Sequence, residues 1–348
     1  MVSRNAVAIV SSILFAVLAA LLVLIPVPYV AWRPGQTIDV LAERDSRPTI
    51  EVSGVPTFPT SGALLMTTVS TTRVDSTLSL PEAVFLYLGQ DSDAMPREVI
   101  YPPGKSSDQV QSEAVAMMDT SRSNATVAAL RAAGVTVTEL PRVSAVAVSG
   151  PAADLLKPGD LILSVNGVST QSRDAVAEQI TKQEAGSVID VEVMREGQTF
   201  TLSITSRPSS SDARRASIGV SIDTGYRYEP TVVLGIDPAV TGPSAGLVFA
   251  LGIYDTISEG LLIGERTVAG TGTITPAGQV GTIGGIREKI KGAERDGASV
   301  FLVPEGNCAD IGQLSTSMSL VKVRTLRDAI SALQLINEGN TAEVPTCG

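Results

Sequence analysis

Two side chains in the C-terminal half of the sequence have the types needed for acyl transfer, Ser244 and Lys289. Ser244 stands at the centre of a Gly-Pro-Ser-Ala-Gly run at 242–246, which predicts a sharp turn before an apolar helix. A serine there lies among helix N-terminal N–H groups, which can hold the oxyanion of an acyl-transfer intermediate. A serine that only caps the helix fits the same pattern.

Lys289 offers a base for this serine. The segment Ile286–Asp296 reads as a helix, and Lys289 falls on its apolar face by the i, i+3, i+4, i+7 spacing that starts at Ile286. An inward lysine loses affinity for its proton because burial disfavours the charged form, and a neutral amine can deprotonate a serine hydroxyl. An ion pair with Glu288 or Glu294 at the helix edge is the alternative.

The composition excludes several other chemistries. There is no histidine, so a Ser-His-Asp site, a Cys-His site and a His-ligated zinc are all excluded. The two cysteines, Cys308 and Cys347, are too few for a metal site and can form a disulfide or stay free. A Gly-Lys-Ser triplet at 104–106 lacks the opening glycine of a phosphate loop, because position 99 is Val99. A net charge of −10 argues against nucleic-acid binding, and we expect neither cofactor nor metal.

The N-terminus predicts a membrane anchor over residues 1–34. Its apolar run, Ala6–Trp32, is long enough to span a bilayer. The run ends in prolines and aromatic residues (Pro26, Pro28, Tyr29 and Trp32), which are typical of an interfacial belt rather than a cleavage site. A cleaved signal peptide is the alternative.

The orientation of this anchor follows weakly from charge, because Arg4 and Arg33 flank the run on opposite sides. A single N-terminal anchor with a short tail most often leaves the body outside the cytoplasm. We therefore expect a single-pass protein of the cell membrane with its main domains extracytoplasmic.

Residues 35–134 are expected to form extracytoplasmic strands and helices. Thr37–Val74 alternates apolar residues with Thr, Ser and Pro, which predicts strands that complete the sheet of a later domain. Ser107–Ala133 predicts two successive helices that end at Gly134.

Residues 135–208 read as a small separate module. Gly150-Pro151-Ala152, then Leu-Lys-Pro-Gly-Asp at 156–160 and an Ile-x-x-Val-Asn-Gly hairpin at 162–167, resemble a bacterial PDZ domain. The resemblance implies that Arg173–Gln183 flanks a groove that takes up an extended peptide as an added strand. No Gly-Φ-Gly-Φ loop stands before Val146, where the carboxylate-binding loop is expected, so a spacer with a closed groove is the alternative.

A serine-rich linker at Ser209–Ser211 leads to a second domain at 209–340. Besides the run around Ser244, this part contains Thr-Gly-Thr-Ile at 271–274, then Ile-Gly-Gly-Ile-Arg-Glu-Lys at 283–289 and a Gly-to-Pro segment at 297–304. In this order the motifs resemble the Lon peptidase domain of Ser-Lys dyad proteases, over Ser217–Leu335.

The Lon resemblance implies that Ser244 is the nucleophile, Lys289 the base and Thr271 a support through its hydroxyl. It also implies supporting positions around the serine, namely Gly242, Pro243, Ala245 and Gly246. Val240 and Thr241 stand where the family carries an aspartate, which puts an acidic helper in doubt. Without a complete Walker A motif, we expect no ATPase module in this chain.

Together these features predict an α+β or α/β fold with an N-terminal transmembrane helix and a PDZ module inserted before a Lon-like proteolytic domain. The expected function is a membrane-anchored serine endopeptidase that cleaves protein or peptide substrates recruited or gated by the PDZ domain, without its own ATPase. The alternatives are a membrane-tethered PDZ adaptor with a non-proteolytic Lon-like scaffold, or a self-processing peptidase. The sequence leaves oligomerisation open.

Overall fold

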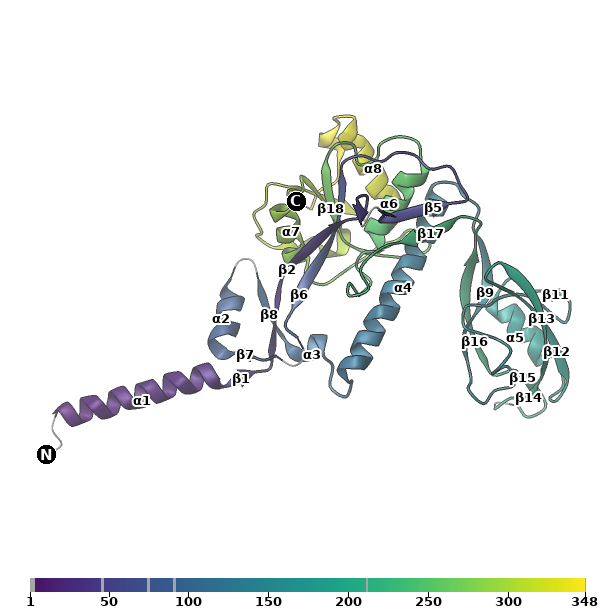
Figure 1. Cartoon of the computed structure of the whole chain (residues 1–348), viewed down its shortest axis with the longest axis horizontal. Coiled ribbons are helices and arrows are strands. Elements are labelled where there is room, and N and C mark those ends of the chain that lie inside the picture. Colours follow the sequence, from purple (N-terminus) through teal and green to yellow (C-terminus); the bar gives the residue numbers. More distant parts are fainter. Residues whose placement is uncertain (1–3, 45–46, 74–75, 90–91, 211, 348) are drawn as a thin grey trace. The chain divides into compact units, whose positions relative to one another are not determined.

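The computed structural model describes residues 4–44, 47–73, 76–89, 92–210 and 212–347. The chain divides into two compact units (Figure 1). Unit 1 is made from Met1–Gly134 and Pro230–Gly348, and unit 2 is Val135–Glu229, so unit 2 is an insertion within unit 1.

The N-terminal helix α1 spans Arg4–Leu24 and is exposed along its length. Within the described residues, it is the one helix long and apolar enough to cross a membrane. It ends ten residues before the predicted limit of the anchor at residue 34, because Pro26 and Pro28 lack the N–H that a helix interior requires. The predicted place of Trp32 in an interfacial belt is also wrong, because Trp32 pairs with Thr71 and Asp93 in the sheet of unit 1.

A six-stranded sheet organises unit 1, with the strand order β22-β21-β18-β6-β2-β8. These strands are β2 (Tyr29–Asp39), β6 (Ala63–Thr71), β8 (Asp93–Pro96), β18 (Thr267–Gly270), β21 (Val300–Pro304) and β22 (Ser319–Val323). The pairs β6·β18, β18·β21 and β21·β22 are parallel, whereas β2 is antiparallel to β6 and β8. One sheet therefore joins strands from both sides of the unit 2 insertion. Val74, the last residue of the predicted strand region, lies outside the described residues.

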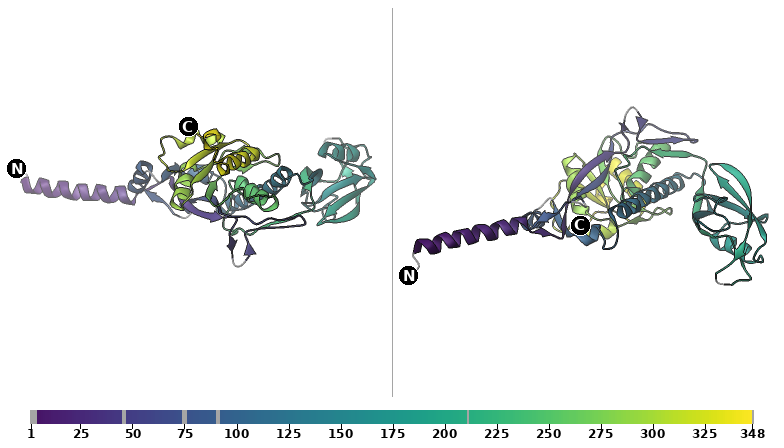
Figure 2. Two further views of the ribbon diagram at one scale, coloured as in Figure 1. Left: turned by 90° about the horizontal axis from the view of Figure 1, so that it is seen from above. Right: turned by 60° about the horizontal axis from the view of Figure 1, so that its bottom comes forward.

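Helices cover both faces of this sheet (Figure 2). Because side chains alternate along a strand, Leu64 and Met66 of β6 contact a core shared with α4 (Ser107–Ala132), α6 (Gly246–Ile257) and α8 (Leu326–Asn337). Leu65 points to the other face, where α7 (Ile286–Arg295) packs. The helices that follow Ser244 and carry Lys289 therefore lie on opposite faces of one sheet.

The helix α4 is continuous, which corrects the prediction of two helices between Ser107 and Ala133. A capping box between Ser106 and Gln109 starts it, and no glycine or proline interrupts it. Two polar residues of this helix, Ser121 and Asn124, bind the carbonyl oxygens of Pro243 and Ile274.

Unit 2 contains the helix α5 and a sheet of order β13-β12-β10-β9-β16, in which β11 also pairs with β10. The elements are β9 (Thr138–Val146), β10 (Leu161–Val165), β11 (Val168–Ser169), α5 (Arg173–Thr181), β12 (Val188–Arg195), β13 (Gln198–Thr205), β14 (Arg207–Pro208), β15 (Ala216–Ser217) and β16 (Val220–Arg227).

The predicted boundary at residues 208 and 209 is wrong. β16 pairs with β9 along its whole length, and Ala216 and Ile218 are buried in the core of unit 2. The predicted linker instead lies between β14 and β15, which pair with each other; its last residue, Ser211, lies outside the described residues. A serine-rich surface turn cannot be distinguished from a linker by composition alone.

The remaining short elements of unit 1 are β1 (Pro26–Val27), β3 (Glu43–Arg44), β4 (Arg47–Pro48), β5 (Ile50–Ser53), β7 (Leu78–Ser79), α2 (Leu80–Leu88), α3 (Arg97–Ile100), β17 (Thr231–Leu234), β19 (Thr273–Ile274) and β20 (Val280–Gly281), with 3-10 turns at Glu305–Asn307, Ala309–Ile311 and Thr341–Glu343. Cys308 and Cys347, whose pairing the sequence left open, form a disulfide with their Cα atoms 5.2 Å apart.

Candidate active site

Ser244 lies in the turn directly before α6. Gly242 opens this turn with a φ of +96°, a conformation that L side chains rarely adopt. Two hydrogen bonds tie the turn to α4: the Gly242 N–H donates to the Ala114 carbonyl oxygen at 3.0 Å, and Ser121 Oγ donates to the Pro243 carbonyl oxygen at 3.0 Å. The long helix α4 therefore fixes the position of the serine.

The segment after β18 holds the turn from its other side. The Gly272 N–H donates to the Ser244 carbonyl oxygen at 2.8 Å, and the Leu247 N–H donates to the Gly272 carbonyl oxygen at 3.1 Å. A Cβ on Gly246 would lie 2.8 Å from a methyl carbon of Ile274, so only glycine fits this approach. In the described part of the chain, no hydrogen bond uses the N–H of Ser244 or Ala245.

Lys289 reaches the serine from the opposite face of the sheet. Its Nζ donates to Ser244 Oγ at 2.8 Å and to Thr271 Oγ1 at 3.0 Å, and Thr271 Oγ1 in turn donates to the Ser244 carbonyl oxygen at 3.1 Å. Thr271 directly follows β18, at the end of the sheet where residues from both faces can meet. The structure thus brings together Ser244, Lys289 and Thr271.

The environment of Lys289 is dry. Its side chain is 2% exposed, and the predicted apolar face of α7 is confirmed by the burial of Ile286, Ile290 and Ala293. Burial lowers the pKa of Lys289 to about 7, because the charged ammonium loses its water. Among the described residues no carboxylate forms an ion pair with it; Glu294 instead accepts hydrogen bonds from Thr316 and Ser317.

Glu288, which directly precedes Lys289 in α7, carries a buried carboxyl that the helical periodicity did not predict. It is 6% exposed, and burial raises its pKa above the usual range. Its carboxylate lies near Gly285 at the start of α7, which the sequence around Ile283–Lys289 gave no means to anticipate.

A cavity of about 460 Å³ opens beside the serine turn. Two of its lining residues are hydrogen-bonded to each other: Asn124 donates from Nδ2 to the Ile274 carbonyl oxygen at 3.0 Å. The cavity joins α4 to the serine turn and β19, and its lining residues are Glu113, Ala116, Met117, Thr120, Ser121, Asn124, Pro243, Thr273 and Ile274. Sequence reasoning missed the α4 residues, because the contact joins segments more than 100 positions apart.

Unit 2 has a separate candidate site at β16, the last strand in the path of its sheet. Ile218 and Gly219 directly precede β16, and Gly219 has a φ of +73°. The Ala147 and Ala152 N–H groups donate to the carbonyl oxygens of Gly219 and Ile218, which fixes this turn. The sequence predicts such a loop before Val146, which lies on the neighbouring strand β9.

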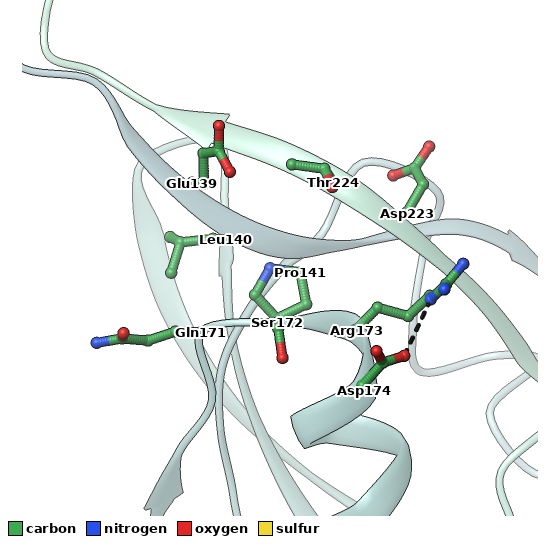
Figure 3. Close-up of a pocket in the computed structure, with 9 residues that line it drawn as sticks. All are labelled: Glu139, Leu140, Pro141, Gln171, Ser172, Arg173, Asp174, Asp223 and Thr224. Carbon is green, nitrogen blue, oxygen red and sulfur yellow. Dashed lines mark hydrogen bonds and ion pairs between the residues drawn. The ribbon is translucent and has the colours of Figure 1, made fainter.

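A cavity of about 410 Å³ lies where α5 begins, between that helix and the strands β9 and β16 (Figure 3). Figure 3 shows Leu140 and Pro141 on the side of Gln171 and Ser172, and Arg173 paired with Asp174. Its full lining is Glu139, Leu140, Pro141, Gln171, Ser172, Arg173, Asp174, Asp223 and Thr224.

Two family models match the chain. The "Lon protease (S16) C-terminal proteolytic domain" matches residues 181–334, and the "PDZ domain" matches residues 114–205. The overlap of the two matches, 181–205, lies wholly inside unit 2 of the structure.

Curated relatives of this chain include Lon proteases. Lon protease 2 of Bacillus subtilis is 34% identical over 98 residues (28% of this chain, 17% of the relative), and Lon protease 1 of Sorangium cellulosum is 34% identical over 125 residues (34% and 15%). Lon protease of Chloroflexus aurantiacus is 30% identical over 161 residues (44% and 18%). The chain thus spans less than a fifth of the length of these relatives.

Among solved structures, the PDZ domain of the SdrC-like protein from Listeria monocytogenes is 22% identical and covers 24% of this chain and 85% of that chain, with a TM-score of 0.22. The PDZ domain of the SdrC-like protein from Listeria innocua is 23% identical and covers 24% and 92%, with a TM-score of 0.22. From the two family matches and the Lon relatives, this chain carries a Lon-type (S16) proteolytic domain together with a PDZ domain.

Proposed function

We propose that the chain is a membrane-anchored serine endopeptidase in which Ser244 is the nucleophile and Lys289 the general base. The observation that carries this proposal is the 2.8 Å contact between Lys289 Nζ and Ser244 Oγ in a buried setting. With a pKa of about 7, Lys289 is a neutral amine in about half of the molecules at pH 7, so it can accept a proton there.

The proton path follows from this geometry. Ser244 Oγ attacks the substrate carbonyl carbon while its proton passes to Lys289 Nζ, and the ammonium then gives that proton to the leaving amine. A water molecule releases the acyl group from Ser244 by the reverse sequence. The unused N–H groups of Ser244 and Ala245 are suited to hold the oxyanion, because they lie at the positive end of α6.

Thr271 acts in this scheme as a positioning residue. Its hydroxyl accepts from Lys289 and donates to the Ser244 backbone, so it orients the amine toward Oγ. The cavity between α4 and β19 is the natural place for a substrate side chain next to the scissile bond, and Met117 and Ile274 give it an apolar character.

The PDZ domain is proposed to recruit or gate substrate through β16. An extended peptide adds to this strand, its terminal carboxylate meets the N–H groups of the turn at Gly219, and its upstream residues reach the cavity at Arg173 and Asp174. The glycine at position 219 before β16 supports this reading over a spacer with a closed groove.

The helix α1 is proposed to remain as a single-pass anchor with the peptidase domain outside the cytoplasm. The Cys308–Cys347 disulfide supports this location, because disulfides persist in oxidising compartments. An N-terminal signal sequence would have the same length and composition, and the mass of the protein purified from membranes distinguishes a retained helix from a cleaved one.

The decisive experiment measures cleavage of an unfolded protein, without ATP, by full-length wild type and by Ser244→Ala and Lys289→Ala. Both variants should lose at least about 100-fold in rate, because a positioned base alone contributes that much. Arg287→Ala is the matched control, since Arg287 lies on the same helix but is exposed. Equal rates for all four proteins would disprove the peptidase proposal.

Two alternatives predict other patterns. A PDZ adaptor with an inactive scaffold captures a partner in both wild type and Ser244→Ala and yields no product in either. A peptidase that cuts only itself gives a shortened band in wild type that is absent from Ser244→Ala, with no cleavage of added substrate.

A further inference from the structure

The short helix α2 (Leu80–Leu88) has an apolar exposed surface. Its five exposed large apolar side chains are Leu80 (39%), Val84 (48%), Phe85 (78%), Tyr87 (71%) and Leu88 (74%). Residues 80, 84, 87 and 88 follow the i, i+4, i+7, i+8 spacing of one helix face, and residue 85 lies beside them. Soluble proteins rarely leave so contiguous an apolar surface in water, so this face is suited to an apolar partner.

The other side of α2 fixes the helix to unit 1. Ala83 and Leu86 are buried in a small core with Ala31 and Leu78. Glu82, the one charged residue of the helix, accepts hydrogen bonds from the Ser79 N–H and Oγ, both at 2.8 Å. The one carboxylate of α2 is therefore bound in the capping box at the start of the helix. The exposed apolar face of α2 carries no charged side chain.

Strand pairing places α2 where α1 ends. β1 follows α1 and pairs antiparallel with β7, which directly precedes α2; Pro26 is opposite Ser79. The two helices are also in contact (Figures 1 and 2). A helix of 21 residues is about 31 Å long, which matches the hydrocarbon thickness of a bilayer, so the end of α1 marks the membrane surface.

We propose that the exposed face of α2 lies in the interfacial layer of the lipid bilayer beside α1 and is a second membrane contact of the chain. This inference rests on the proposed membrane anchor. None of the spanning window of α1 is buried, and the exposed Val84, Phe85 and Leu88 belong to a helix that contacts α1, so one lipid surface is suited to cover both. Tyr87 has the amphipathic ring that the headgroup region favours.

This contact would do more than add affinity. β2, whose Ala31 packs in the core that holds α2, is a strand of the same sheet as β6 and β18. If α2 lies on the membrane, the sheet of unit 1 has a fixed distance and orientation relative to the bilayer surface. If α1 is the single contact, the sheet can rotate about the connection between α1 and β2.

The test uses the full-length chain in vesicles of phosphatidylcholine and phosphatidylglycerol with brominated acyl chains, which quench tryptophan on contact. Trp32 is the only tryptophan of the sequence, so Trp32→Phe gives a silent background for probes. Phe85→Trp reports on α2, and Phe15→Trp reports on α1. Val233→Trp is the matched control, because Val233 is 52% exposed but lies on β17, which pairs with β5.

We expect the Phe85→Trp probe to be quenched at least about threefold more strongly than the Val233→Trp probe, and to emit at shorter wavelength. Quenching of Phe15→Trp with none of Phe85→Trp would overturn this inference and leave the anchor intact. No quenching of Phe15→Trp would refute the anchor and this inference together, while the peptidase assay would be unaffected.

A second copy of the chain on α2 has its own signature. The Phe85→Trp probe would then be shielded from acrylamide in water but not quenched by brominated lipid, which would overturn the inference. If Trp32→Phe weakens the fold, the three probes are introduced into the chain that keeps Trp32. The spectrum of this parent is then subtracted from that of each probe variant before quenching is compared.

Discussion

Lys289 Nζ and Ser244 Oγ meet at 2.8 Å although α7 and α6 pack on opposite faces of one sheet. The contact forms beyond the end of β18, where Thr271 bridges the two sides. Such a site depends on the whole sheet, because a shift of either helix along its face separates the two atoms.

The pH dependence of cleavage should report the neutral form of Lys289. Because burial lowers its pKa to about 7, kcat/KM should rise about tenfold per pH unit below pH 7 and level off above it. The measurement is kcat/KM from pH 5 to pH 9, with circular dichroism to show that the fold persists. A flat profile between pH 5 and pH 8 would contradict the role of Lys289 as base.

Replacement of Thr271 separates positioning from folding. Thr271→Val removes the hydroxyl that orients Lys289 and should lower kcat by roughly 10- to 100-fold with little change in KM. It also removes an acceptor for the ammonium, so the lower limb of the pH profile should move to lower pH. Thr271→Ser keeps the hydroxyl and should restore most of the activity; equal losses in both variants would indicate a packing role only.

A buried carboxyl away from the active site makes stability pH-dependent. Asp255 is 1% exposed, its Oδ1 accepts from the Leu262 N–H at 2.9 Å, and its Oδ2 has no partner among the described residues. Burial raises its pKa to about 6 from 3.8, so the folded state holds the proton more tightly than the unfolded chain does. Its contribution to stability is therefore present below pH 3.8 and is lost as the pH rises through about 6.

Asp255→Asn should consequently raise the free energy of unfolding at pH 8 by about 1–3 kcal/mol, with a smaller gain at pH 5. Urea unfolding at the two pH values measures this difference. Glu259→Gln, at an exposed neighbouring position, serves as the control and should change little. An equal gain at both pH values would mean that packing, not ionisation, is responsible.

The PDZ groove can be tested by peptide chemistry alone. Full-length Ser244→Ala, which binds without cutting, should bind an unstructured peptide with a free C-terminus at least about tenfold more tightly than its amidated form. Arg173→Ala should change the preference for residues upstream of the terminus, because Arg173 lines the cavity at the start of α5. Equal binding of the free and amidated peptides would argue against carboxylate capture at Gly219.

The sequence predicted best those features that depend on residues close together in the chain. The inward face of α7, with Lys289 among Ile286, Ile290 and Ala293, follows from helical spacing, and its burial is confirmed. The catalytic roles of Ser244 and Lys289 come from motif resemblance and stay predictions, now supported by their contact. The N-terminal apolar run was over-extended, because β-branched residues such as Val30 suit a buried strand as well as a membrane helix.

The sequence could not predict contacts between segments that lie far apart in the chain. The assignment of β16 to unit 2 depends on its pairing with β9, about 80 positions earlier, and no local pattern encodes that register. The same holds for Ser121 and Asn124 of α4, whose hydrogen bonds to the serine turn and β19 join segments more than 100 positions apart.

The insertion of unit 2 also determines when unit 1 can fold during synthesis. Leu64 of β6 pairs with Val268 of β18, and this pair cannot form until the whole of unit 2 has been synthesised. Lys289 and then Cys347 emerge later still. The contact between Lys289 and Ser244 therefore cannot form until the segment that carries Lys289 has been synthesised, so a nascent chain of the proposed peptidase would be inactive up to that point.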